Sequence, residues 1–166
     1  MKRFKWLAFG LCIVILLSLY LYQNYIYYKI PFNPIKEYAS ESLVDFHITK
    51  NLPNGEPVNG KCHESKTLGL VLEYFSNLKL IPLKDNDKLT LSPNKGNGTY
   101  LTGMLEFKQS TKIFISDIYI DNPTVLYIGS TTDGFKGKGY YKIVDSKFDY
   151  DYIFDLIGDN ETVEQQ

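Results

Sequence analysis

An uninterrupted apolar stretch near the start of the chain constrains where the rest of the protein can lie. Residues Trp6 to Tyr22, WLAFGLCIVILLSLYLY, include no charged side chain. At a rise of about 1.5 Å per residue, a helix of this length is roughly 25 Å long, and half-polar residues up to Tyr28 extend it. Such a helix can span the hydrocarbon core of a bilayer. We therefore predict a transmembrane signal anchor over residues 6–28.

Basic residues predict the orientation of this anchor. Lys2, Arg3 and Lys5 lie in the short N-terminal segment 1–5, and the next basic residue after the apolar stretch is Lys29. Lysine and arginine beside a span favour the cytoplasmic side of the membrane. We expect the N-terminus in the cytoplasm, and the domain that follows on the extracytoplasmic side of the cell membrane.

A cleaved signal peptide is the main alternative interpretation of the same stretch. Signal peptidase requires small residues at the end of the apolar region. The residues found there are bulky tyrosines that suit the headgroup layer, namely Tyr20, Tyr22, Tyr25, Tyr27 and Tyr28. This pattern favours an anchor that stays uncleaved. A buried helix of a soluble domain is the other alternative, and the leading basic cluster argues against it.

The residues after the anchor are sufficient for one domain with its own core, since about 135 of them remain. From residue 31 onward the chain has 14 basic and 19 acidic residues, a formal net charge of −5. This charge does not predict binding to nucleic acid or to an anionic membrane surface. The same part contains a single cysteine, Cys62, so we expect no internal disulfide, a composition more typical of bacterial envelope proteins than of small disulfide-rich secreted domains.

Hydrophobic periodicity predicts an α+β domain with a mostly antiparallel sheet and two amphipathic helices on one face. We expect a stalk at 29–42, the domain at 43–158 and a polar tail at 159–166. Alternation and β-branched or aromatic enrichment predict strands over 43–49, 78–83, 99–108, 112–120, 125–129 and 139–144, with a short strand at 89–91. Apolar residues at helical spacing predict helices over 64–78 and 146–158.

Three local signals sharpen this prediction. Turn-forming residues throughout 51–61 predict a long loop, and Pro82 predicts that its strand lies at an edge of the sheet. In the strand 112–120, the set containing Phe114, Ser116, Ile118 and Ile120 is the more apolar one, so we expect it to face the core.

The start of the last helix also has a sequence signal. Ser146 precedes the acid Asp149 by three residues, which fits a capping box at the N-terminus of a helix. We therefore expect Ser146 to cap the last helix.

Candidate chemistry centres on His47, Cys62 and His63. A zinc site needs three or four ligands in a defined geometry, and adjacent Cys and His side chains rarely reach one metal together, so we predict no metal site. No sequence motif indicates a cofactor. A Cys62 nucleophile with His47 as its base stays an alternative, because such pairs meet in space rather than in sequence.

A glycine-rich basic segment, Gly134 to Gly139, is the second candidate surface. A phosphate-binding loop should open a helix, whereas a strand is predicted to follow here. We interpret the segment as a hairpin tip on which Phe135, Lys136 and Lys138 contact a partner.

The layout, with a basic N-terminus, one apolar span and a cysteine-poor outer domain, is similar to that of many small envelope proteins of Gram-positive bacteria. From it we expect a non-catalytic, membrane-anchored module that binds an envelope protein or polymer. One alternative is a small envelope hydrolase that uses His47, Cys62 or His63. A membrane-anchored immunity or self-protection protein is the other.

Overall fold

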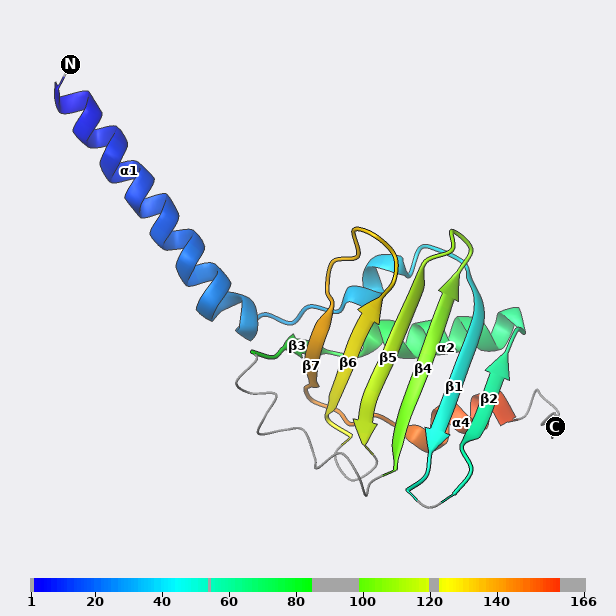
Figure 1. Ribbon diagram of the computed structural model, residues 1–166. Coiled ribbons are helices and arrows are strands. Elements are labelled where there is room, and N and C mark those ends of the chain that lie inside the picture. Colours follow the sequence, from blue (N-terminus) through cyan, green and yellow to red (C-terminus); the bar gives the residue numbers. More distant parts are fainter. Residues whose placement is uncertain (1, 54, 85–98, 120–122, 159–166) are drawn as a thin grey trace.

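The computed structural model describes residues 2–53, 55–84, 99–119 and 123–158 (Figure 1). The strand predicted at 89–91 and the tail 159–166 lie outside these described residues.

The N-terminal apolar stretch forms one long helix. Helix α1 (Lys2–Leu21) continues through a π-helical turn, η1 (Tyr22–Ile26), and a 3-10 turn, η2 (Tyr27–Lys29). The segment Trp6–Lys29 is long and apolar enough to cross a membrane, and its most apolar part is not buried by the rest of the chain. A signal sequence near an N-terminus shares this length and composition.

The described residues after this helix form a seven-stranded sheet in which every neighbouring pair is antiparallel, so the predicted α+β class is confirmed. The spatial order is β2-β1-β4-β5-β6-β7-β3. The strands are β1 (Leu43–Asn51), β2 (Val58–Cys62), β3 (Leu80–Pro82), β4 (Tyr100–Phe107), β5 (Lys112–Tyr119), β6 (Val125–Ser130) and β7 (Gly139–Ile143). Strand β3 is an edge strand, as Pro82 predicts, because proline has no amide hydrogen for a further neighbour.

Helices α2 (Ser65–Asn77) and α4 (Tyr150–Gly158) lie behind the sheet in Figure 1, so they cover one of its faces. Helix α2 follows β2 at one edge of the sheet and leads to β3 at the other. The core is formed where the buried side of each helix meets the sheet; Phe75 of α2, for example, packs edge-on against Phe46 of β1, with ring centroids 5.9 Å apart. Helix α4 buries Ile153 and Ile157 in the same core.

The start of α4 differs from the prediction. The helix begins at Tyr150, and the Asp149 carboxylate accepts a hydrogen bond from the Tyr152 amide over 3.0 Å. Asp149 therefore has the capping role that we expected of Ser146. An aspartate that accepts from the third amide after it is as good a cap as serine.

Strand β2 corrects the prediction of a loop throughout 51–61. A Cβ at Gly60 would lie 3.1 Å from Ile157 Cγ2 and 3.2 Å from Ile48 Cγ2, both tight contacts. Gly60 thus allows α4 to pack closely on the sheet at this point, whereas the composition of the segment suggested a turn. A glycine inside a strand often marks such a close approach.

The face assigned to β5 was wrong for its first half. Ile113 and Ile115 are buried, with 0% and 2% of their surface exposed, whereas Phe114 lies on the opposite face and is only half-buried. The register explains the error, because Gly103 pairs with Ile115 but Leu101, two residues earlier in β4, pairs with Ile118. The extra residue in β5 is a bulge, and a bulge shifts the alternation of faces by one position.

The residues that join the N-terminal apolar helix to the sheet pack on the domain. Ile35, in the 3-10 turn η3 (Pro34–Tyr38), is fully buried in the core. The Phe32 amide donates a hydrogen bond over 2.8 Å to the carbonyl of Leu80 in the edge strand β3. Much of the segment expected to be a stalk therefore belongs to the packing of the domain, and it occupies part of a sheet edge that would otherwise be free to pair with another chain.

Candidate functional site

One face of the sheet is left without a helix among the described residues (Figure 1). We call it the open face, and define it by the strand residues that alternate with the buried ones. Most of these are half-buried, namely Asp45, His47, Thr49, Thr102, Met104, Glu106, Lys112, Phe114, Ser116, Tyr127 and Tyr140, whereas Asn59, Lys61 and Lys142 are exposed. The face is polar over β1 and β2 and aromatic over β5, β6 and β7.

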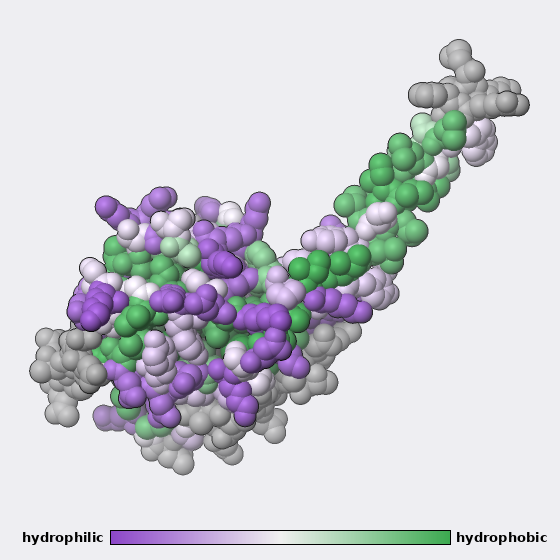
Figure 2. All heavy atoms as spheres, turned by 180° about the vertical axis from the view of Figure 1, so that it is seen from behind, coloured by the Kyte–Doolittle hydropathy of each residue, from purple (hydrophilic) through white to green (hydrophobic). Residues whose placement is uncertain are grey.

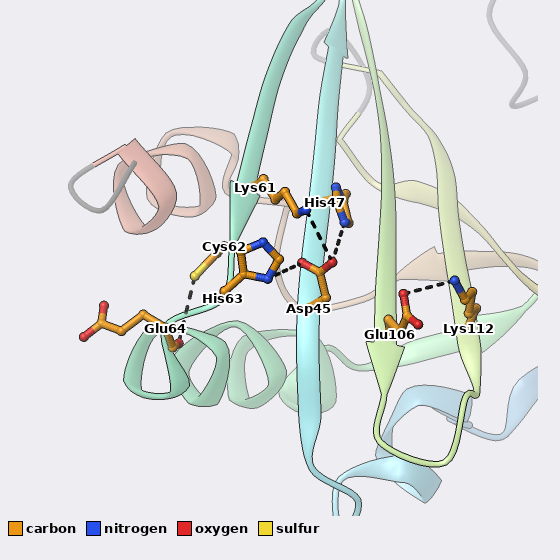
Figure 3. Close-up of polar contacts among 8 residues, drawn as sticks. All are labelled: Asp45, His47, Lys61, Cys62, His63, Glu64, Glu106 and Lys112. Atoms are coloured by element: carbon orange, nitrogen blue, oxygen red, sulfur yellow. Dashed lines mark hydrogen bonds and ion pairs between the residues drawn. The ribbon is translucent and has the colours of Figure 1, made fainter. Parts of the chain in front are cut away.

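Four polar side chains meet at the β2 edge of the open face, and we call them the Asp45 cluster (Figure 3). His47 Nε2 lies 2.6 Å from Asp45 Oδ2, and His63 Nδ1 lies 3.2 Å from Asp45 Oδ1. Lys61 Nζ is 4.0 Å from Oδ2. The carboxylate is 16% exposed, while the side chains of His47 and His63 are 36% and 52% exposed. Three nitrogen groups thus surround one largely buried carboxylate.

Strand pairing explains this convergence. In the β1–β2 hairpin His47 pairs directly with Lys61, and residues two apart on one strand share a face, so Asp45, His47, Lys61 and the following His63 lie together. Because an ionised carboxylate only accepts hydrogen bonds, His47 Nε2 is the donor to Asp45. Asp45 therefore fixes the orientation of the His47 ring.

A second charged pair lies beside the Asp45 cluster, on the side of strand β4. Asp45 pairs across β1 and β4 with Glu106, which places two carboxylates opposite each other. Lys112 Nζ lies 3.0 Å from Glu106 Oε2. Like charges directly opposite on neighbouring strands are destabilising, and Lys112 offsets this repulsion.

The structure separates Cys62 from the two histidines. Cys62 is 1% exposed and faces the core, whereas His47 and Lys61 face the other side of the sheet (Figure 3). The Cys62 thiol points to the carbonyl oxygen of Glu64, 4.0 Å away. A pair in which Cys62 attacks and His47 acts as its base is therefore not assembled in this arrangement.

The Asp45 cluster nevertheless has an arrangement that suits acid–base chemistry. A histidine oriented by a carboxylate can remove a proton from water, and a second histidine nearby can return one. The two imidazole rings are 6.4 Å apart between centroids and perpendicular. Within the described residues, no group of three or more His, Cys, Asp or Glu side chains is arranged to hold a metal ion.

The aromatic part of the open face is built around a glycine. Phe114 pairs with Gly129, and the Tyr127 ring lies over that glycine, where a Cβ would be 2.9 Å from Tyr127 Cε1. The Tyr127 and Tyr140 rings pack with centroids 5.0 Å apart. Gly129 therefore lets the Tyr127 ring lie flat along the sheet, which offers a broad aromatic surface to a ligand.

The structure also locates the three residues predicted at the hairpin tip. Phe135 is half-buried, and its ring stacks on Tyr38 with centroids 5.8 Å apart. Lys136 and Lys138 are exposed. The phenyl ring thus helps to hold the tip on η3, and the two lysines are the side chains that a partner can reach; their role in binding stays a prediction.

Sequence reasoning placed Asp45 and His47 on one strand face but missed that His63 and Lys61 join them. The missing step was strand β2. In VNGKC, Val58 and Cys62 alternate with Asn59 and Lys61, which is the pattern of a strand, but the glycine and the preceding turn residues hid it.

No protein-family model, curated protein or solved structure matches this chain.

Proposed function

We propose that the protein is a single-pass membrane protein whose extracytoplasmic domain is a non-catalytic binding module. The open face carries this proposal. Polar side chains that can form hydrogen bonds lie beside an aromatic surface, and most of them are half-buried on the antiparallel sheet. Mixed surfaces of this kind bind proteins and polymers.

The length and apolarity of Trp6–Lys29 support the anchor. The basic residues before it support a cytoplasmic N-terminus, and the tyrosines after it support an uncleaved segment. An envelope protein or an envelope polymer is the ligand we propose. Lys136 and Lys138 are candidate contacts outside the open face.

Site-specific photocrosslinking in the cells that make the protein tests this proposal. A benzophenone amino acid replaces Thr102 in the open face, Lys136 at the hairpin tip, or the exposed Lys147 before α4 as a matched control. We expect one defined adduct from position 102 or 136 and none from position 147. Adducts from none of the three positions, or equally from all, would overturn the proposal.

A hydrolase is the second candidate, because Asp45 orients His47 as a catalytic carboxylate orients a general base. Its test is turnover of 4-nitrophenyl acetate and bis(4-nitrophenyl) phosphate by the full-length protein. If the protein is a hydrolase, His47→Ala lowers the turnover rate about 100-fold or more, whereas Lys66→Ala leaves this rate unchanged. Turnover by wild type no faster than by His47→Ala would rule out this site. No structural observation favours the self-protection alternative over these two.

A further inference from the structure

A groove separates α2 from α4 on the side of the domain opposite the open face. Two adjoining hollows of about 510 and 410 Å³ form it, and both are lined by Leu70 and Tyr152. Figure 2 shows this side of the molecule, where apolar patches lie between hydrophilic ones. We call this feature the helix groove.

The floor of the helix groove is apolar but accessible. Leu70 of α2 is 37% exposed and Tyr152 of α4 is 40% exposed. The Tyr152 ring packs against Tyr74 with centroids 5.4 Å apart, which fixes its position beside α2. A side chain from another molecule could cover both residues at once, which would remove apolar surface from water.

The sides of the helix groove are acidic. Glu73 and Asp149 line the first hollow, and Glu64 and Asp155 line the second. Lys66, which lines the second hollow, is the one basic side chain among the described residues that line the two hollows. Carboxylates thus border the apolar floor at both ends.

We propose that the helix groove binds a cationic amphipathic peptide segment. An apolar or aromatic side chain of this segment would cover Leu70 and Tyr152. Its lysine or arginine side chains would pair with the carboxylates on either side. Complementary charge beside an apolar centre provides both orientation and a faster encounter.

The same charges argue against other occupants. Nucleic acid and anionic lipid headgroups are repelled by a surface with four carboxylates and one ammonium group. A second copy that used the same face would place like charges against each other. The partner is therefore a basic peptide segment, and it does not come from the same groove of a second copy.

Peptide binding to the full-length protein tests this inference. The protein is reconstituted in phosphatidylcholine nanodiscs, and empty nanodiscs give the background. The probe is the fluorescein-labelled peptide KRLWLRK, blocked at both ends, and EELWLEE is its acidic counterpart. Fluorescence anisotropy should show binding of the basic peptide only, and weaker binding as salt rises towards about 1 M, where screening is nearly complete at contact distances.

The decisive variants reverse charges that have no capping role. Glu73→Lys together with Asp155→Lys should weaken binding of KRLWLRK about ten-fold or more. Asp151→Lys together with Glu56→Lys, two exposed acids outside the groove, changes the net charge by the same amount and is the matched control. It should change the affinity less than about two-fold, since only general charge is altered. Leu70→Ser should also weaken binding, which separates the apolar contact from charge alone.

Three outcomes would overturn the proposal: no binding by wild type, equal binding of both peptides, or equal loss in the Asp151→Lys/Glu56→Lys control and in the groove variant. Replacement of Thr102 on the open face should leave peptide affinity unchanged. Failure of the open-face proposal can therefore be distinguished from failure of this one. Unfolding curves of each variant show whether a loss of binding comes from a loss of fold.

Discussion

The side-chain amide of Asn33 donates a hydrogen bond to the carbonyl oxygen of Phe75 over 2.8 Å. It also donates to the carbonyl of Leu78, 2.9 Å away, and its own oxygen accepts from the Ile35 amide over 3.0 Å. The last carbonyls of a helix have no partners within the helix. One asparagine thus provides hydrogen-bond donors to the C-terminal end of α2 and joins this end to the segment that follows the N-terminal apolar helix.

We predict that Asn33→Asp destabilises the domain although the two side chains have the same shape. The carboxylate cannot donate, and its charge faces carbonyl oxygens at the negative end of a helix. The expected loss is about 2 kcal/mol or more in urea unfolding. The folded state raises the pKa of the new carboxyl, so this loss grows as pH rises above about 4. Asn77→Asp, at the exposed end of α2, should cost only a few tenths of that; equal losses would contradict the prediction.

Two glycines of the β6–β7 hairpin allow backbone strain alone to be compared with backbone strain combined with a packing clash. Gly134 and Gly137 have positive φ angles of 79° and 111°. An alanine Cβ meets nothing at position 134, but at position 137 it would lie only 2.4 Å from Cβ of Pro34. We expect Gly134→Ala to cost about 1 kcal/mol for conformation alone. Gly137→Ala should cost at least about 2 kcal/mol more in the same unfolding assay, and similar losses would disprove the contact with Pro34.

The charge balance on the open face predicts a loss of stability that a second substitution restores. Lys112→Met removes the partner of Glu106 and leaves its carboxylate opposite Asp45 without compensation. We expect a loss of about 0.5–1 kcal/mol, because Lys112 is partly exposed and solvent screens the pair. Adding Glu106→Gln should restore most of it, which a double-mutant cycle measures. If the second substitution restores nothing, the two carboxylates do not repel each other appreciably.

Buried tyrosines predict weaker folding in alkali. Burial raises the pKa of Tyr141, and its hydroxyl donates to the carbonyl of Gly137 over 2.7 Å. Burial also raises the pKa of Tyr74. Since the folded state holds these protons more tightly, their contribution is complete below about pH 10 and is lost as pH rises above it.

Tyr141→Phe should therefore lower stability by about 1 kcal/mol at pH 8, where the hydrogen bond is lost. Between about pH 10 and 11.5 its stability should fall less steeply than that of wild type. Urea unfolding across this range measures both effects. A pH dependence identical to that of wild type would contradict the prediction.

The sequence was most informative where periodicity is local. The apolar helix, both amphipathic helices and the antiparallel strands of the second half follow from spacing alone. The face of β5 could not be derived, because the bulge between Ile115 and Ile118 depends on the partner strand β4. A single alternation along the strand therefore placed Ile113 on the wrong side.

The candidate site was less predictable than the fold, because it depends on pairing between strands. Asp45 and His47 are two residues apart, so their common face is a local property. Lys61 and His63 reach them only through the β1–β2 hairpin, whose second strand resembled a loop in sequence. Likewise, Ile35 is buried because the rest of the domain packs against η3, and no local sequence pattern reveals this packing.

The order of the strands also determines the distance between the two edges of the sheet. The segment after the N-terminal apolar helix joins the sheet at β3, and the Asp45 cluster lies at β2, the opposite edge. Six interstrand steps separate these edges, which at about 4.8 Å each amounts to roughly 29 Å. A molecule held beside His63 would thus be kept at a fixed distance from the end of the N-terminal apolar helix, because the number of strands sets this distance and no flexible segment contributes to it.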